Sequence, residues 1–263
     1  MIIDAHTHVW PDALAEKALT ANRLPGLTAV SDGKASTLAT EMAARGIGHS
    51  MALGVAGAAK HVDRTNEFVA SLDRTTFTPF GTVHVDSSVE ENLASLRRHG
   101  ISGVKVHPLF QGFGLMHERL WEIFEAFGDE IGVIVHVGAG GSGEVNSLST
   151  PSMVRKIVET FPRLRLVVCH FGGYHMLAEA EEELRGLDVV LETSWPPSLA
   201  KVDPTTVRRI ISRHGPERVV FGSDWPMTDP AEEIAAIRAL GLGDDAEAAI
   251  LGANLARVMR LPV

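Results

Sequence analysis

Short runs of apolar residues alternate with longer amphipathic stretches along the whole chain. Several runs are almost continuously apolar, such as Val133-Ile134-Val135, which is typical of parallel strands that are covered on both faces. The pattern predicts eight strands, at Ile2–His8, His49–Val55, Phe77–His84, Val104–His107, Gly132–Val137, Leu166–His170, Val189–Thr193 and Val219–Gly222.

The stretches between the strands have the spacing of amphipathic helices. Ser88 and Glu91 form a capping-box signal, and Pro151 stands at a first helical position. After the first strand, an extended loop at about residues 11–35 could form a lid. The pattern predicts helices at Ser36–Arg45, His61–Ser71, Val89–His99, His117–Phe127, Pro151–Thr160, Tyr174–Arg185, Thr205–His214, Ala231–Leu240 and Asp245–Val258.

Eight strand–helix repeats without a break in composition predict a single-domain (β/α)8 TIM barrel over residues 1–263. The alternative is a doubly wound open sheet, which usually has fewer strands, and no G-x-G-x-x-G motif follows the first strand here. The glycine-rich segment 138–143 lacks the Gly-Lys-Ser/Thr of a phosphate-binding loop. It is expected to be a flexible loop, or to let a substrate approach the backbone.

Charge and composition narrow the classes of partner. The chain carries 24 basic and 33 acidic side chains, a net charge of −9, which argues against nucleic acid and anionic membranes as partners. A single cysteine, Cys169, excludes an intrachain disulfide framework. The first residues do not resemble a secretory leader, and no apolar stretch approaches the ~20 residues that span a bilayer. A cytoplasmic protein that binds a small-molecule substrate is expected.

Histidine and aspartate residues stand at the ends of several predicted strands. His6 and His8 close the first strand, and residues two apart on a strand share a face. His136 and His170 end the fifth and sixth strands, and Asp224 lies just past the eighth. Because the active sites of such barrels lie at the carboxyl ends of the strands, these groups should converge. The alternative is an unrelated hydrogen-bonding role for each of them.

Imidazole and carboxylate ligands suit one divalent metal ion. Zn²⁺ is expected first, with Mn²⁺, Fe²⁺, Co²⁺ and Ni²⁺ as alternatives. Since thiolates are absent from the set, the pattern favours a catalytic site with an open position for water over a closed structural site.

Five segments, in this order along the chain, resemble the amidohydrolase superfamily, and more narrowly its amidohydrolase-2 branch. That branch contains aminocarboxymuconate-semialdehyde decarboxylase-like enzymes and metal-dependent hydrolases, and its members are often dimers, so a homodimer is one expectation. The segments, besides the strand-end His136, are residues 6–8 (HTH), 103–108 (GVKVHP), 169–173 (CHFGG), 221–226 (FGSDWP) and 250–257 (ILGANLAR).

The resemblance implies that His6, His8, His136 and Asp224 hold one divalent metal ion, and that His170 stands close to the activated water. A bound metal lowers the pKa of water towards ~7. Asp224 could then take the proton as general base and pass it to the leaving group, while His170 orients the water or polarises a carbonyl.

Lys105 and His107 share a face of the fourth strand. In binuclear relatives a carboxylated lysine from this strand bridges two metals. For Lys105, pairing with an interior carboxylate or binding of substrate is the favoured interpretation. His107 is a candidate for the substrate pocket, with a structural hydrogen bond as the alternative.

Aromatic residues in the loops after the strands predict a largely apolar pocket mouth. The candidates are Trp10, Phe110, Phe113, Trp195 and Trp225. Basic residues are scarce in these loops (Arg23, Lys34, Lys60 and Arg64). Because enzymes commonly bind a substrate carboxylate with a forked arginine, this scarcity argues against a decarboxylase.

The leading hypothesis is a mononuclear metal-dependent hydrolase of a small carboxylic ester, lactone or amide. The second is a metal-dependent non-oxidative decarboxylase. The third is a barrel that binds a metal or a small molecule without turnover.

Overall fold

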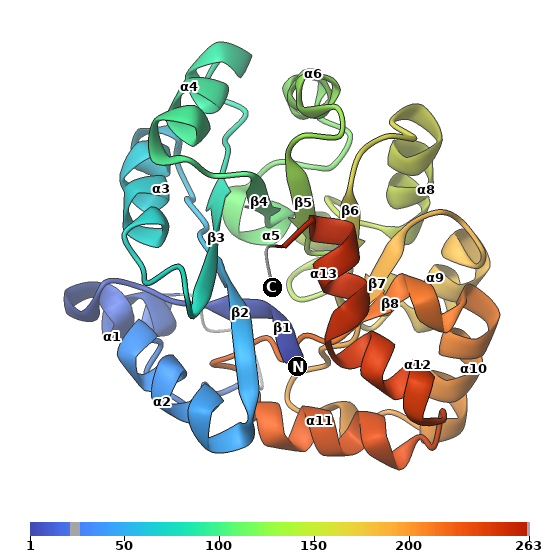
Figure 1. The fold of residues 1–263 in the computed structure, drawn as a ribbon. Coiled ribbons are helices and arrows are strands. Elements are labelled where there is room, and N and C mark those ends of the chain that lie inside the picture. Colours follow the sequence, from blue (N-terminus) through green and yellow to red (C-terminus); the bar gives the residue numbers. More distant parts are fainter. Residues whose placement is uncertain (22–26, 262–263) are drawn as a thin grey trace.

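The strands of the chain pair in sequence order. The computed structural model describes residues 1–21 and 27–261, and its eight parallel strands form one sheet in the order β1 to β8. The sheet curves into a nearly closed barrel with helices around it (Figure 1), so the predicted (β/α)8 barrel is confirmed. The strands are β1 (Ile2–His8), β2 (Ile47–Leu53), β3 (Phe77–Thr82), β4 (Gly103–Val106), β5 (Gly132–Val135), β6 (Leu166–Val168), β7 (Val190–Glu192) and β8 (Val219–Val220).

The chain that follows the short strand β8 closes the barrel against β1. The Ala5 amide donates to the Phe221 carbonyl at 3.0 Å, and the Asp224 amide donates to the His6 carbonyl at 2.8 Å. Thr7 and Trp225 form an isolated parallel bridge. This closure brings residues more than 200 positions apart in sequence side by side.

Most of the helices lie outside the strands and form a ring around the barrel (Figure 1). The positions expected from the sequence agree with the structure within a few residues for most of them. The helices are α1 (Asp12–Ala21), α2 (Ala35–Arg45), α3 (Val62–Ala70), α4 (Val89–His99), α5 (Pro108–Gln111), α6 (Glu118–Phe127), α7 (Gly143–Asn146), α8 (Pro151–Thr160), α9 (Leu177–Leu184), α10 (Pro204–His214), α11 (Pro230–Ala239), α12 (Asp244–Ala248) and α13 (Asn254–Met259).

Three segments differ from the pattern-based expectation. The extended loop expected at 11–35 contains α1, whose single buried residue, Ala15, produces almost no periodic apolar signal. The helix expected from Tyr174 begins at Leu177, because the chain turns through left-handed conformations at His170, Phe171 and His175. The helix expected at 245–258 is divided by a π-helical turn at Ala249–Ala253.

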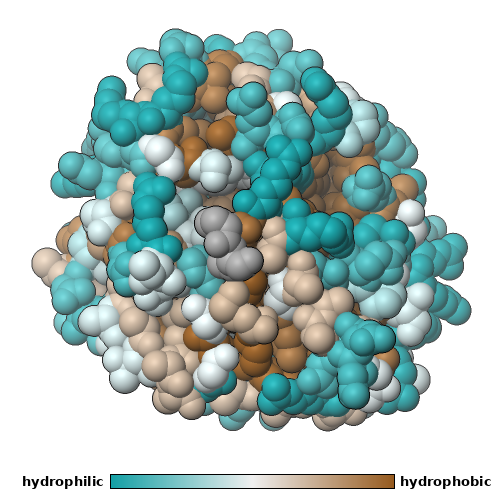
Figure 2. Space-filling view, viewed as in Figure 1, coloured by the Kyte–Doolittle hydropathy of each residue, from teal (hydrophilic) through white to brown (hydrophobic). Residues whose placement is uncertain are grey.

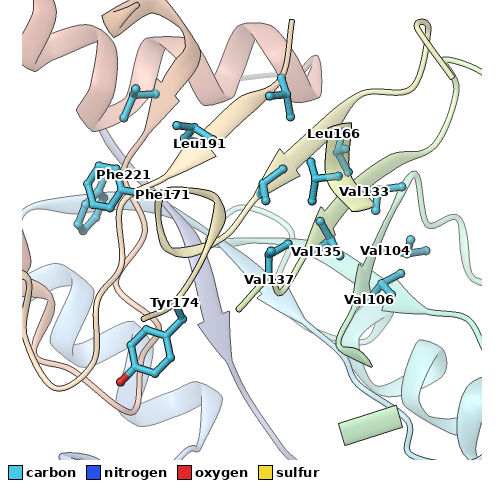
Figure 3. Packing of buried hydrophobic residues seen from close by; sticks show 14 of the residues in the cluster. Val104, Val106, Val133, Val135, Val137, Leu166, Phe171, Tyr174, Leu191 and Phe221 are labelled. Carbon is cyan, nitrogen blue, oxygen red and sulfur yellow. The ribbon is translucent and has the colours of Figure 1, made fainter. Parts of the chain in front are cut away.

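Two hydrophobic layers stabilise the barrel. One lies between strands and helices, and Figure 3 shows its valines on β4 and β5 side by side. The other fills the barrel itself, where Ile3, Met51 and Phe80 pack together. On β5, Val133 and Val135 belong to the outer layer and Ile134 to the inner one, as expected for a strand with two covered faces.

Helix α13 covers the end of the barrel at which β1 begins (Figure 1). Its Leu255 and Met259 join the inner hydrophobic cluster. Figure 2 shows the same face, where hydrophilic side chains surround smaller hydrophobic areas. The opposite end, where the strands finish, is left for a site. Within the described residues, no helix has the length and apolar character needed to cross a membrane.

A β-bulge in β1 aims its two histidines. Between Asp4 and Thr7 the chain advances three residues while its partner strand β2 advances only from Ser50 to Ala52. The extra residue breaks the alternation of faces, and such bulges commonly re-aim side chains next to active sites. Ile3 and Ala5 therefore pack in the inner cluster, and His6 and His8 also face the barrel axis above them.

Candidate active site

Three side chains meet at the carboxyl ends of the strands, two from β1 and one from the chain that follows β8. The Nε2 atoms of His6 and His8 lie 3.1 Å apart. Asp224 Oδ1 lies 3.2 Å from His6 Nε2 and 3.7 Å from His8 Nε2. Of the predicted ligands, His6, His8 and Asp224 are thus brought together around one point.

The two strand-end histidines of β5 and β6 lie against this group. His170 joins His6 and Asp224 in a set whose potential ligand atoms all lie within 4.8 Å of one another. His136 Nδ1 lies 3.1 Å from His170 Nε2, and His136 Nε2 is buried without a hydrogen-bond partner among the described residues. His170, which was expected beside the metal rather than on it, thus belongs to this set, whereas His136 contacts it through His170.

The donor set fits a divalent metal ion. Ligand atoms bound to a tetrahedral Zn²⁺ at ~2.0–2.1 Å lie roughly 3.3 Å from one another, close to the separations among His6, His8 and Asp224. Burial lowers the pKa of His6 and His136 well below the usual value, and lowers that of His8 and His170 to about 3. These imidazoles are therefore neutral, which is the form that binds metals.

Glu192 and Ser194 determine the tautomers of two of these histidines. Glu192 Oε2 lies 3.0 Å from His6 Nδ1, so the Nδ1 proton points to the carboxylate and Nε2 keeps its lone pair. The Ser194 carbonyl accepts from His170 Nδ1 at 3.0 Å, with the same result for His170. The Ser194 hydroxyl donates to Glu192 Oε2 at 2.9 Å. Burial raises the pKa of Glu192 to about 7.

Sequence reasoning missed Glu192, although a signal was present. Glu192 is the last residue of β7, so it is a polar strand-end residue like His6, His8 and His136. Glu192 meets His6 because the barrel closes and brings β7 near β1. The residue pattern of β7 alone does not contain this information.

A sharp turn after β8 presents Asp224 to the site. Asp224 has a φ of 63°, and left-handed backbone of this kind is uncommon outside glycine and clusters at functional sites. Asp4 holds the turn in place, because its carboxylate accepts from the Ser223 hydroxyl at 2.6 Å and from the amides of Ser223 and His6. Burial raises the pKa of Asp4 to about 6 and that of Asp224 well above its usual value.

Lys105 lies beneath the ligand cluster and is fully buried. Its Nζ atom lies 3.1 Å from His6 Nε2 and 3.0 Å from Cys169 Sγ. The ion pair expected with an interior carboxylate is not found among the residues that the structure describes. Lys105 does not line the cavity described next, so its predicted contact with substrate is not apparent in this arrangement.

A cavity of about 150 Å³ opens above the cluster. Seven predicted site residues line it: His8, Trp10, His107, Phe110, His136, His170 and Asp224. The remaining lining residues were not predicted, and they are Leu19, Leu27, Leu53, Val55, Gly57, Tyr174, Pro196, Pro226 and Met227.

The other predicted pocket residues lie away from the cavity lining. Trp225 is fully buried, and its indole Nε1 donates to Glu41 Oε2 at 3.1 Å, so it packs in the core behind the Asp224 turn. Trp195 packs against Tyr174, with ring centres 5.1 Å apart, and Phe113 against His84. A loop position thus did not guarantee that an aromatic ring faces the pocket.

Within the described lining there is no lysine or arginine. Lys34 pairs with Asp32, and Arg64 contacts His61. Arg23 lies outside the described residues. The part of the cavity that the structure describes is therefore an apolar hollow with neutral histidines and one aspartate at its floor.

Fold and site together define a (β/α)8 barrel with a candidate metal centre at the carboxyl ends of its strands. The family model described as Amidohydrolase matches residues 3–261, so the chain belongs to this amidohydrolase family. The family contains hydrolases and decarboxylases and is metal-dependent. No curated protein is similar enough to the chain to count as a match.

Solved structures of the same fold cover nearly the whole chain. A TIM-barrel protein from Bordetella bronchiseptica is 20% identical, with a TM-score of 0.75 over 98% of both chains. A protein from Pseudomonas putida described as a 2-pyrone-4,6-dicarboxylic acid hydrolase is 18% identical, with a TM-score of 0.70 over 100% of this chain and 98% of its own. A dihydroxybenzoic acid decarboxylase from Polaromonas sp. JS666, with bound manganese and 2-nitroresorcinol, is 13% identical, with a TM-score of 0.76 over 100% and 97%.

Proposed function

We propose that this protein is a mononuclear metal-dependent hydrolase of a small carboxylic ester, lactone or amide. The observation that carries the proposal is the meeting of His6 Nε2, His8 Nε2 and Asp224 Oδ1, within 3.1 to 3.7 Å, at the floor of an apolar cavity. In this proposal His6, His8, His136 and Asp224 hold the metal, and Trp10, His107 and Phe110 contact the substrate.

When bound, a divalent cation would supply Lewis-acid activation of water and of a carbonyl oxygen. Asp224 accepts the proton of the attacking water and passes it to the leaving oxygen or nitrogen as the carbon–heteroatom bond breaks. His170, held by the Ser194 carbonyl, orients the water. Because burial raises the pKa of Asp224, a neighbouring cation is needed to keep its carboxylate ionised at neutral pH.

Zn²⁺ is the first candidate for the metal, because three neutral imidazoles and a carboxylate are typical ligands of a catalytic zinc ion. Mn²⁺ is the second, since the structurally similar decarboxylase from Polaromonas binds manganese. Fe²⁺, Co²⁺ and Ni²⁺ share the same ligand preferences to a lesser degree.

Non-oxidative decarboxylation is the second candidate function, and the fold shared with the Polaromonas decarboxylase favours it. In that reaction the metal would orient a substrate oxygen, and Asp224 or His170 would deliver the proton that replaces carbon dioxide. The absence of lysine and arginine from the described part of the cavity lining favours the hydrolase, since carboxylated substrates are commonly bound by a forked arginine.

Two measurements test the proposal. Purified protein reconstituted with Zn²⁺ should hold about one equivalent, whereas less than a tenth of an equivalent would remove the mechanism. The holoenzyme is then assayed with aryl esters, lactones and anilides, and with aromatic and muconate-type acids for release of carbon dioxide. Release of carbon dioxide without ester or lactone hydrolysis would establish the second candidate, and metal binding without any turnover would indicate a binding protein.

Asp224→Asn tests the proton transfer. The variant keeps a side-chain oxygen near His6 but loses the base, so kcat should fall by a factor of about 10²–10⁴. Ligand affinity and thermal stability are measured beside kcat. Unchanged turnover would remove Asp224 from the chemistry.

A further inference from the structure

His107 lines the cavity, lies outside the proposed ligand set and takes no part in the proposed proton transfer, and its ring is held rigidly. The ring stacks between Phe110, at 4.0 Å and 20°, and His136, at 4.2 Å and 11°. Its backbone amide donates to Gln111 Oε1 at 2.8 Å. Gln111 Nε2 in turn donates to the Val83 carbonyl at 2.8 Å, which ties the end of β4 to β3. Packing and hydrogen bonds of this kind hold the ring in a single orientation, as is typical of residues that bind a ligand.

The two nitrogen atoms of this ring have different surroundings. His107 Nδ1 is buried and has no hydrogen-bond partner among the described residues. Nε2 has no hydrogen bond there either, but the residue lines the cavity, and Nε2 is not among the buried atoms. Nε2 is therefore the nitrogen that faces the cavity.

The proton of the neutral ring belongs on the nitrogen that can find an acceptor. A proton on Nδ1 would bury an N–H donor without a partner, which is rare in folded proteins and costs about 1–3 kcal/mol. A doubly protonated ring would bury the same Nδ1–H without a partner, so that form is disfavoured as well. The remaining form carries its proton on Nε2 and presents an N–H donor to the cavity.

We propose that His107 Nε2 donates a hydrogen bond to an uncharged oxygen of the substrate, separate from the oxygen atoms at the reacting carbonyl. His136, one of the proposed ligands, has its ring centre 4.2 Å from that of His107 and 4.8 Å from that of His170, so His107 lies beside the ligand set without belonging to it. Given the function proposed above, the substrate is an ester, lactone or amide with an apolar body and a second ether, carbonyl or hydroxyl oxygen.

The rest of the wall supports an uncharged substrate. Trp10, Leu53, Val55 and Phe110 give the same cavity apolar walls. A neutral N–H donor in such surroundings stabilises a neutral acceptor, while a carboxylate there would lose its hydration without a compensating charge. His107 thus acts as a binding residue that selects for an oxygen at one place on an apolar molecule.

The tautomer of His107 is the first test, and it does not depend on turnover. Protein labelled with ¹⁵N at histidine is examined in its zinc-loaded form by long-range ¹H–¹⁵N correlation, and the His107 signals are assigned by their loss in His107→Gln. The Nε2–H tautomer is expected. The Nδ1–H tautomer would overturn the proposal, because Nε2 would then have no proton to donate.

The second test uses aryl acetates in matched pairs, in which an oxygen replaces one methylene of a para, meta or ortho substituent, such as methoxyphenyl and ethylphenyl acetate. His107→Phe keeps the ring stack but removes the donor. For at least one pair, it should lower kcat/KM about tenfold for the oxygen-containing member and less than about twofold for its counterpart. His107→Gln, whose amide can reach a similar position, should restore part of the preference.

Outcomes of the second test separate the two proposals. If His107→Phe changes both members of every pair equally, His107 has a structural role only and the inference is wrong. If the wild-type holoenzyme hydrolyses none of the esters, lactones and anilides assayed above, the proposed function fails, and the tautomer alone decides whether His107 is a donor.

Discussion

His6 is joined to the site through both of its ring nitrogen atoms. Nδ1 meets the Glu192 carboxylate at 3.0 Å, and Nε2 meets His8, Asp224 and Lys105 within 3.1 to 3.2 Å. A histidine that binds a metal through one nitrogen commonly donates its other N–H to a carboxylate, which holds the ring in place and increases its basicity. The arrangement at Glu192 therefore supports His6 as a ligand.

Glu192→Gln should weaken metal binding. The amide has nearly the same shape but lacks the negative charge that holds the Nδ1 proton of His6, so the affinity for Zn²⁺ should fall by a factor of about 10–100. Competition with a chromophoric chelator measures this affinity without any assay of activity. Glu233→Gln is the matched control, since Glu233 is also a fully buried glutamate but contacts Leu199 rather than the cluster. Equal affinities in both variants would contradict the role of Glu192.

At the scale of elements, the loops after β5 and β6 are held together at one glycine. Gly138 has a φ of 115° and forms a bridge with Tyr174, whose ring lines the cavity. A Cβ atom at position 138 would overlap the backbone of Tyr174, with the Tyr174 Cα atom only 2.7 Å away. Because the clash is with backbone rather than with a flexible side chain, the two loops would have to separate.

Gly138→Ala should therefore destabilise the protein by about 2 kcal/mol or more, from strained backbone and the clash together. Urea unfolding measures this, and substrate KM should rise as Tyr174 moves. Gly143→Ala is the control, because a Cβ atom there meets nothing within 4 Å. A loss of stability in Gly138→Ala no larger than in the control would show that the loops are not coupled at this point.

Helix α11 carries another buried carboxylate, that of Glu233, which does not contact the ligand cluster. Glu233 Oε1 accepts from the Leu199 amide at 2.8 Å, and Oε2 has no partner among the described residues. Burial raises the pKa of Glu233 from its ordinary value of 4.5 to about 8. Glu233 connects α11 to the loop after β7, which also supplies Pro196 to the cavity.

Stability should therefore fall as the pH rises from about 4.5 to 8. In this range the folded protein keeps the Glu233 proton while the unfolded chain has lost it, so unfolding is favoured by up to ~1.4 kcal/mol per pH unit from this one group. Glu233→Gln removes the titrating group. Its free energy of unfolding should depend less steeply on pH over this range than that of the wild type. Parallel pH dependences would contradict the assignment.

On the scale of the whole molecule, one end of the barrel holds the candidate site and the other contributes to stability. The end where the strands finish carries the ligand cluster and the cavity, and the end where they begin is filled by the inner hydrophobic cluster and α13. In barrels of this kind the first end serves chemistry and the second serves stability.

Leu255→Ala tests this separation. Leu255 on α13 is fully buried in the inner cluster, so its truncation should destabilise the protein by about 2–5 kcal/mol. Zn²⁺ affinity under folding conditions should stay within about twofold of the wild type, because the cluster lies at the other end. Leu14→Ala, at a position that is 47% exposed, is the control for stability. A large loss of metal affinity in Leu255→Ala would show that the ends are coupled.

The sequence alone determined the barrel and the strand-end residues of the candidate site. Eight alternations of apolar and amphipathic segments identify the fold, and His6, His8, His136, His170 and Asp224 stand where parallel strands all end at the same edge. That inference needs only the local pattern and one rule of topology.

Only the tertiary structure decided how these residues are supported and which others face the cavity. Glu192 contacts His6 because the closed barrel brings β7 near β1. Trp225 is buried in the core instead of lining the pocket. Helix α1 forms where the sequence has almost no periodic apolar pattern. Each of these depends on contacts between segments distant in sequence. A local pattern records whether a residue is buried or exposed, but it does not record which partner the residue meets.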